Sequence, residues 1–430
     1  MHRSSKLAAV ARNGAVVRGA VAWLLLSYIG ACAAKPPRST AIDSGTSGQV
    51  ENDGGAGGAS STGDPTIRLG DAQTLLASGA LGLEYFPDEG TSILTQSPYR
   101  IILADGLSKS TFVLEATASG SDPLTGLPSA TATRILSPGG PGTFDNGYAG
   151  VSAVYRHTDG VFYAFYHAED QESTGTIPGT FIPGFYARIG IVYSADGTTW
   201  TKGGYVIESN VHKRTPDGVA VQYDQGAAEP GAIASADGRY LYLYYTEHSR
   251  LDGVGGSARP VEICMARADL ATWPPSFPTT PGPLHGVFTK YRAGTFSTDG
   301  IGGLDSPVVV PPTTSSNSLE GHVAYSRTLG KFVMIYGVDA WNERSAPSPR
   351  AVVSGLYVAF SDDGIVWRPS PTPLILDFGV VQPGLSVSWE ASILWDRATD
   401  TQGWLVYGFS PNWTNPPHYM AGRRISLSPQ

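Results

Sequence analysis

The chain has 430 residues and a formal net charge of −8, and only 15% of its residues are charged. This acidic balance argues against nucleic acid as the partner, because neutralising phosphates requires clustered Lys and Arg side chains. The 53 glycines, 32 prolines and 21 tyrosines favour an all-β protein with many turns over a helical one.

Residues 1–31 have the three parts of a cleaved export signal. Four basic residues and no acidic ones come first, and an apolar run from Ala20 to Ala31 follows. This run is shorter than the roughly 20 apolar residues that a membrane span needs. Cleavage would remove the four positive charges and change the net charge from −8 to −12.

The signal ends in Ile29-Gly30-Ala31-Cys32, which resembles the lipobox of bacterial lipoproteins. The resemblance implies that the Cys32 thiol carries a lipid and anchors the protein in the membrane of the cell envelope, on the periplasmic or the cell-surface side. A plain secretory signal that ends near a cysteine is the alternative.

Residues 32–64 are rich in Gly, Ser and Thr and contain almost nothing apolar. Such a segment cannot bury enough surface to offset its ordering entropy, so it is predicted to be a flexible tether. The folded body is expected to be residues 65–430. Its only cysteine, Cys264, lies in an apolar run and is expected to be buried, without a disulfide partner.

One pattern recurs in the body: an apolar strand, a tight Gly turn and a second strand rich in Tyr and Phe. The four predicted strand pairs are 151–155 with 161–166, 231–234 with 240–245, 322–325 with 332–336, and 391–395 with 404–407. Their turn glycines are 78, 92 and 73 residues apart. This spacing suits a four-stranded propeller blade with long loops.

Further strands are expected outside these four copies. Ser194–Trp200 and Ser361–Trp367 each contain Asp-Gly, which is typical of a hairpin turn. Segment 98–116 supplies strands before the first copy, and 423–427 supplies a last one. The sequence therefore predicts an all-β, five-bladed β-propeller closed by strands from both termini, which leaves no exposed sheet edge. Six blades remain possible.

The Ser-x-Asp-Gly-x-x-Trp turns and the aromatic second strands resemble five-bladed propeller glycoside hydrolases of the arabinanase, β-xylosidase, β-fructosidase and mannoside-phosphorylase type. The resemblance covers most of residues 135–430. In sialidase Asp boxes a residue separates Asp from Gly, and these turns lack it. The resemblance implies a carbohydrate partner and hydrolysis of poly- or oligosaccharide. A non-catalytic propeller that binds a glycan or a protein is the alternative.

Acidic residues stand close to the start of the first strands, where the ligand face of a propeller is expected. Glycoside hydrolysis requires one protonated and one ionised carboxyl group. By resemblance, Asp145 is the base or orients the substrate, and Glu229 is the acid or tunes it. If the third blade supplies the acid, Glu320 or Asp305 would hold it. The candidate catalytic residues are thus Asp145, Glu229, Glu320, Asp305 and Glu390.

Polar residues after the second strands and three tryptophans are candidates for binding the sugar. They are His167, Glu169, Glu247, His248, Asp339, Trp341, Trp389 and Trp413. The spacing of the two histidines matches no metal motif, so no metal is predicted; the sequence leaves the cofactor unknown.

Overall fold

The computed structural model describes residues 63–116, 122–172, 174, 184–213, 224–249, 261–310, 316–339, 355–376, 387–411 and 418–430. The chain divides into two compact units, Met1–Thr46 and Ser47–Gln430, and all described residues belong to the second. The predicted signal, Cys32 and the tether up to residue 62 lie outside the described residues. Within those residues, no helix is long and apolar enough to cross a membrane.

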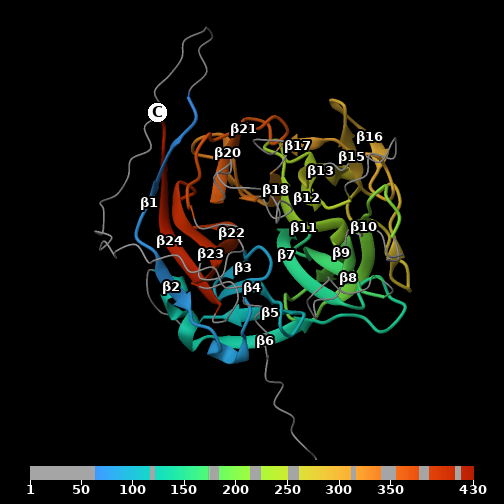
Figure 1. Ribbon diagram of the computed structural model, residues 1–430, viewed down its shortest axis with the longest axis horizontal. Coiled ribbons are helices and arrows are strands. Elements are labelled where there is room, and N and C mark those ends of the chain that lie inside the picture. The colour runs from blue at the N-terminus through green and yellow to red at the C-terminus, as the bar shows by residue number, and fades with distance from the viewer. Residues whose placement is uncertain are drawn as a thin grey trace, which may run out of the picture. The chain divides into compact units, whose positions relative to one another are not determined.

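The strands form five blades, as the sequence predicts, and Figure 1 shows them arranged around a common centre. The first blade comprises β3 (Ser92–Gln96), β4 (Tyr99–Asp105), β5 (Ser110–Glu115) and β6 (Thr131–Leu136). The second comprises β7 (Tyr148–Arg156), β8 (Phe162–Asp170), β9 (Phe185–Ser194) and β10 (Thr201–Ile207).

The third blade is larger than the others. Its three inner strands are β11 (Asp224–Ala234), β12 (Tyr240–Glu247) and β13 (Glu262–Asp269). Short strands pair around its outer side: β14 (Gly282–Pro283), β15 (Thr289–Arg292), β16 (Thr295–Asp299) and β17 (Pro307–Val309). β11 also pairs in parallel with β9, so the second and third blades share one sheet.

The last two blades complete the set. The fourth comprises β18 (Asn317–Ser326), β19 (Lys331–Asp339), β20 (Gly355–Ser361) and β21 (Arg368–Pro369). The fifth comprises β22 (Val387–Trp395), β23 (Gln402–Ser410), β24 (Tyr419–Ser428), β1 (Thr66–Leu69) and β2 (Gln73–Leu76). Three short 3₁₀ turns connect strands: η1 (Ala80–Gly82), η2 (Pro123–Ser129) and η3 (Leu270–Thr272).

The four predicted strand pairs are confirmed as the antiparallel pairs β7–β8, β11–β12, β18–β19 and β22–β23. The predicted hairpin turns also form. Gly197 and Gly364 have φ of 71° and 76°, which side chains with a Cβ rarely adopt. In the first turn the carboxylate of Asp196 accepts the backbone N–H groups of Thr198 and Thr199. The local chemistry of Asp-Gly therefore sets these turns.

The two ends of the propeller sequence meet in the fifth blade, as predicted. β1 pairs antiparallel with β24, with Thr66 opposite Ser428 and Leu69 opposite Ile425. The innermost strands also contact one another in succession: β7 with β11, β11 with β18, β18 with β22, and both β22 and β7 with β3. These contacts place the five inner strands around one axis.

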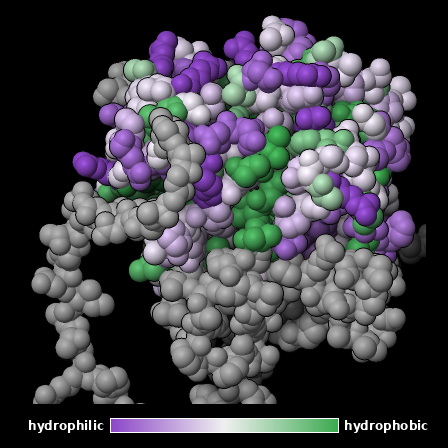
Figure 2. Space-filling model, turned by 90° about the horizontal axis from the view of Figure 1, so that it is seen from above, coloured by the Kyte–Doolittle hydropathy of each residue, from purple (hydrophilic) through white to green (hydrophobic). Residues whose placement is uncertain are grey.

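The core consists of five apolar clusters, one between each pair of successive blades. For example, Val333 and Ile335 of β19 pack with Leu405 of β23 across the fourth and fifth blades. Cys264 is buried, without a disulfide, in the cluster between the second and third blades, as expected. Among the coloured residues of Figure 2, an apolar strip lies between polar flanks on the side of the propeller. Burial of apolar side chains between sheets is what holds the blades together.

Candidate active site

Three glutamates occupy the same structural position in three successive blades. Glu229 lies in β11, Glu320 in β18 and Glu390 in β22. The strand register shifts at each of them, so that two residues of the inner strand face one residue of its partner. Such β-bulges re-aim a side chain and are frequent next to active sites.

The backbone of all three glutamates is left-handed, with φ of 53° at Glu229, 57° at Glu320 and 49° at Glu390. An L residue with a Cβ is crowded in this conformation, and the cost at functional sites is of order 1–3 kcal/mol each. Six non-glycine residues of the described ranges have positive φ, and these glutamates are half of them. Strain repeated at equivalent positions points to a functional role for the three side chains.

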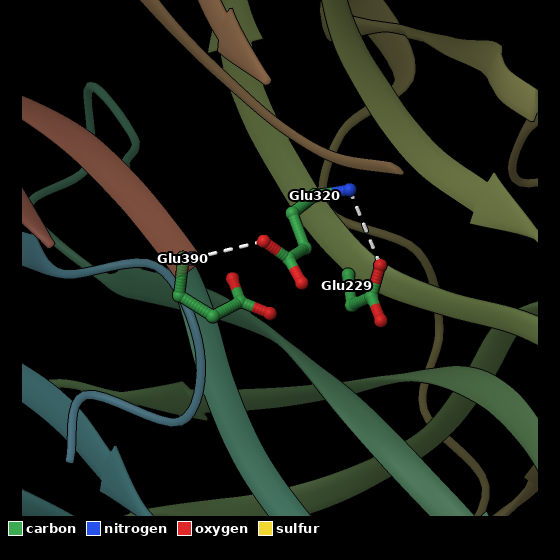
Figure 3. Close-up of side chains that lie close together, drawn as sticks. All are labelled: Glu229, Glu320 and Glu390. Atoms are coloured by element: carbon green, nitrogen blue, oxygen red, sulfur yellow. Dashed lines mark hydrogen bonds between the residues drawn. The ribbon is translucent and has the colours of Figure 1, made fainter. Parts of the chain in front are cut away.

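The three side chains converge on the axis and are linked through backbone hydrogen bonds (Figure 3). The N–H of Glu320 donates to Oε2 of Glu229 (3.2 Å) and to the hydroxyl of Thr246 (2.9 Å). The Thr246 hydroxyl donates to the same Glu229 oxygen (2.6 Å), and the N–H of Glu390 donates to Oε2 of Glu320 (2.9 Å). One oxygen from each carboxyl group lies within 4.8 Å of the other two.

Glu390 and Glu229 have opposite electrostatic surroundings. Burial raises the pKa of Glu390, and the nearby carboxylates of Glu320, Glu89 and Glu229 raise it further. Burial acts in the same direction on Glu229, but the hydrogen bond and charge of His248, 3.5 Å away, lower the pKa of Glu229 to about 2. The surroundings thus favour the protonated form of Glu390 and the ionised form of Glu229, the division of roles that acid–base catalysis uses.

The segment before β3 adds two carboxyl groups that the sequence analysis missed. Glu89 is buried, and its Oε1 lies 2.8 Å from Nδ1 of His167. Burial, and then Glu229 and Glu169, raise the pKa of Glu89; burial and Glu89 do the same for Asp88. The available signal was the pair Asp88-Glu89 just before an apolar strand; in the other blades a single acidic residue stands close to the start of the inner strand.

His322 was also missed as a site residue, because it was considered only as the first residue of a predicted strand. Its Nε2 lies 2.8 Å from Oε2 of Glu390, and its ring is buried. Burial lowers the pKa of His322 to about 4, although Glu229 opposes this shift. The ring is therefore neutral at neutral pH.

Two of the predicted catalytic residues, Asp145 and Asp305, do not belong to this group. Asp145 forms an ion pair with Lys202 of β10 and accepts the hydroxyl of Tyr166 (3.1 Å), so it faces outward across the second blade. Asp305 lies 3.4 Å from Lys290 and accepts the hydroxyl of Tyr245 (2.7 Å) in the third blade. The carboxylates of Asp145 and Asp305 are thus each paired with a lysine and a tyrosine hydroxyl within their own blade. This pairing gives no support to a catalytic role for either residue.

Four predicted sugar-binding residues lie at the ends of β8 and β12. His167 is held by Glu89, and Glu169 accepts a hydrogen bond from Gln171 (2.6 Å). Glu247 ends β12, and burial followed by Asp305 raises its pKa to about 8. His248 follows it and neighbours Glu229. His167 and Glu169 therefore adjoin Glu89, and His248 adjoins Glu229. Contact of these residues with a sugar remains a prediction.

The tryptophans predicted to stack on a sugar are only partly described. Trp389 is buried; its indole N–H donates to the carbonyl of Pro87 (2.9 Å), and its ring stacks on Tyr85 at 5.6 Å between centroids. These contacts place Trp389 in the core instead of on an open surface. Asp339 ends β19, and its side chain, Trp341 and Trp413 lie outside the described residues.

In the described ranges, one group of three or more His, Cys, Asp or Glu residues has its ligand atoms close enough together to share a cation. It consists of Glu229, Glu320 and Glu390. Each of the three, however, already accepts or shares a hydrogen bond with a protein group: the Glu320 N–H, the Glu390 N–H or His322. A carboxylate has about four lone-pair sites, so these bonds leave other sites on each group open. The absence of a metal therefore stays a prediction from the sequence, and the opposite pKa shifts of Glu390 and Glu229 are the reason to treat the group as an acid–base cluster.

No family model and no curated protein matches the sequence. Among solved structures, the chain is similar to an α-L-arabinofuranosidase from Lactobacillus brevis (12% identity over 83% of this chain and 91% of that chain, TM-score 0.48). It is also similar to an endo-1,4-β-xylanase from Bacteroides thetaiotaomicron (9%, 84% and 97%, TM-score 0.43). A third is an N-acetylgalactosamine deacetylase from F. plautii (10%, 84% and 95%, TM-score 0.44). The five blades are assigned from the strand pairing given above, not from these likenesses.

Proposed function

We propose that the protein is a glycoside hydrolase in which Glu390 is the general acid and Glu229 the ionised carboxylate. The observation that carries this is the convergence of Glu229, Glu320 and Glu390 on the axis of the propeller, where the surroundings move the pKa values of Glu390 and Glu229 in opposite directions. Glu390 donates its proton to the leaving oxygen, and Glu229 stabilises or attacks the sugar carbon. Glu320 connects the two through its backbone N–H and its carboxylate.

The spacing of the carboxyl groups supports retention of configuration. One oxygen of each carboxyl group lies within 4.8 Å of the others; since whole carboxyl groups are farther apart than their nearest oxygens, this is compatible with the roughly 5–5.5 Å between the groups of retaining enzymes. Glu229 would then attack the anomeric carbon while the bond to the leaving oxygen breaks and Glu390 protonates that oxygen. A water molecule deprotonated by Glu390 would next attack the same carbon and release the sugar from Glu229. The pH profile of kcat/KM should fall at high pH as Glu390 loses its proton, and the ionised form of Glu229 should persist down to about pH 2.

The test is release of reducing sugar from arabinan, xylan, fructan and mannan, followed by substitution in the wild-type background. Glu390→Gln and Glu229→Gln should each lower kcat by about 100-fold or more, because each removes a proton-transferring or nucleophilic group. Glu115→Gln, at an exposed carboxylate of β5, is the matched control and should have no effect. Asp145→Asn should leave kcat close to that of wild type.

Hydrolysis that survives both glutamate substitutions would disprove the assignment of the site. Binding of a polysaccharide without any hydrolysis by the wild-type chain would instead favour the non-catalytic propeller. The stereochemical proposal is checked separately by observing the anomer released first in the NMR spectrum of the product.

We also propose that the propeller is held at the cell envelope by a lipid on Cys32. The supporting observation is the lipobox-like end of the export signal, followed by a segment of tether composition. In a bacterial host, Cys32→Ser should abolish incorporation of labelled palmitate and move the protein from the membrane to the soluble fraction. Cys264→Ser is the control, because that thiol is buried in the core. Membrane association unchanged by Cys32→Ser would refute the anchor.

A further inference from the structure

A cavity of about 640 Å³ lies on the axis of the propeller, beyond the glutamates in the strand direction. Its wall includes residues from β7, β11, β18 and β22, and from the start of β3. Gly231, His322 and Ser392 line it, and each follows its glutamate by two positions. The cavity therefore begins where the acid–base cluster ends.

His322 stands between the cavity and Glu390. Its Nε2 is 2.8 Å from Oε2 of Glu390 on β22, and its Nδ1 is 3.4 Å from the hydroxyl of Ser152 on β7. The imidazole thus reaches from its own strand, β18, to two others around the axis. Only 6% of the residue is exposed.

Gly90 packs directly against this ring. A Cβ built at Gly90 would lie 2.2 Å from Cε1 and 2.4 Å from Nδ1 of His322, so no larger residue fits while the ring stays in place. The N–H of Gly90 donates to the Ser152 hydroxyl (3.1 Å), which fixes the loop there. The ring is therefore held by contacts on three sides: Glu390, Ser152 and Gly90.

We propose that His322 is a positioning residue that plugs the propeller axis, orienting Glu390 and excluding the water of the cavity from its carboxyl group. This inference rests on the proposed function of Glu390 as the acid. Burial is the largest cause of the raised pKa of Glu390, so a seal on the cavity side preserves the protonated form.

The electrostatics around the plug agree with this role. The titratable groups that face Glu390 are the carboxyl groups of Glu320, Glu89, Glu229 and Asp88 and the hydroxyl of Tyr85, and a negative charge on any of these carboxyl groups favours the protonated form of Glu390. A cationic plug would oppose them, but His322 is neutral, because burial lowers its pKa to about 4. The plug therefore excludes water without adding a charge that would ionise the acid.

The first test is the pH profile of kcat/KM. His322→Ala would admit water to Glu390 and lower its pKa, so the alkaline limb should move to lower pH by about one unit or more, with little change in KM. His322→Gln keeps most of the volume and a hydrogen bond, and its limb should stay within about half a unit of wild type. Val323→Ala, the next residue of β18 and also a cavity residue, is the matched control and should leave the profile unchanged.

The second test is rescue by imidazole. His322→Ala leaves a space of the size of imidazole that opens to the cavity. Added imidazole should bind this variant, raise its melting temperature and return the alkaline limb toward that of wild type, whereas wild type should bind none at this position. Gly90→Ala, which pushes the ring aside without removing it, should shift the limb in the same direction without rescue.

These outcomes separate the inference from the proposed function. If the wild-type chain hydrolyses no glycan, the proposed function fails, but calorimetry still tests whether imidazole binds the alanine variant alone. Failure of imidazole to bind that variant, or an equal limb shift in Val323→Ala, would overturn the plug. If His322→Ala does not fold, the pH profiles of Gly90→Ala and His322→Gln test the plug role of His322 instead. An unshifted alkaline limb in Gly90→Ala would then contradict that role.

Discussion

Glu229, Glu320 and Glu390 share one backbone conformation but differ in electrostatic environment. Their φ angles lie between 49° and 57°, so the bulge fixes the direction of each side chain in the same way. The neighbours then determine the charge: His248 beside Glu229 stabilises the anion, whereas Glu390 faces other carboxylates and a neutral histidine. The conformation of the strand therefore sets the direction of each glutamate side chain, and the residues that pack against the side chain set its protonation.

The strain at these positions can be measured at Glu320. Glu320→Gly should give a free energy of unfolding about 1 kcal/mol higher than Glu320→Ala, because both remove the carboxylate and only glycine tolerates positive φ without a steric cost. Denaturant unfolding of the two variants checks this. The same pair of substitutions at Val323, which has ordinary backbone, should show alanine as the more stable variant. Equal stabilities at position 320 would mean that the backbone there is unstrained.

At the scale of elements, the same bulge recurs in β11, β18 and β22, whereas the outer strands of the third blade depart from the common plan. There a hairpin, β15–β16, and β17 pair with β13 in place of a single outer strand. Lys290 of β15 is fully buried, and its ammonium donates to the carbonyls of Glu208 (2.7 Å) and Gly303 (2.9 Å). With Asp305 at 3.4 Å, Lys290 ties these outer segments to the blade.

Lys290→Met should destabilise the protein by about 3–5 kcal/mol, because it leaves the largely buried Asp305 carboxylate without its cation and takes one donor from the carbonyls of Glu208 and Gly303. Thermal and denaturant unfolding provide the measurement. Arg368→Met is the comparison: it breaks an ion pair with Asp64 that is exposed, and such pairs are worth about 0–1 kcal/mol. A loss below 1 kcal/mol at Lys290 would show that the third blade does not depend on this pair.

At the scale of the molecule, the site depends on contacts between residues far apart in the sequence. Glu89 and Glu390 lie about 300 residues apart in the sequence. Their segments nevertheless meet: the N–H of Thr91, two residues after Glu89, donates to the hydroxyl of Ser392, two residues after Glu390 (3.0 Å). β1 and β24 pair across an even larger separation. Because all five apolar clusters lie between blades, the acid–base cluster is assembled by the same packing that unites the blades.

The sequence by itself determined the blades, because a hairpin is encoded locally. The strand pairs around Gly160, Gly238, Gly330 and Gly403 follow from alternating apolar residues and turn chemistry, and all four are confirmed. The spacing of Glu229, Glu320 and Glu390 before these turns was likewise readable, since equivalent positions in repeats occupy equivalent places. The roles of Cys32 and residues 1–64 rest on the sequence alone.

Only the tertiary structure decided which carboxyl groups meet. Asp145 and Glu229 look alike in sequence, yet one pairs with Lys202 across its blade and the other points to the axis. Glu89 joins the site because the segment before the first blade contacts His167 of the second, and His322 joins it because the fourth blade packs beside the fifth. Contacts with Pro87 and Tyr85 place Trp389 in the core. The direction of a side chain at a bulge, its burial and hence its pKa depend on neighbours from other blades, and no local pattern encodes those neighbours.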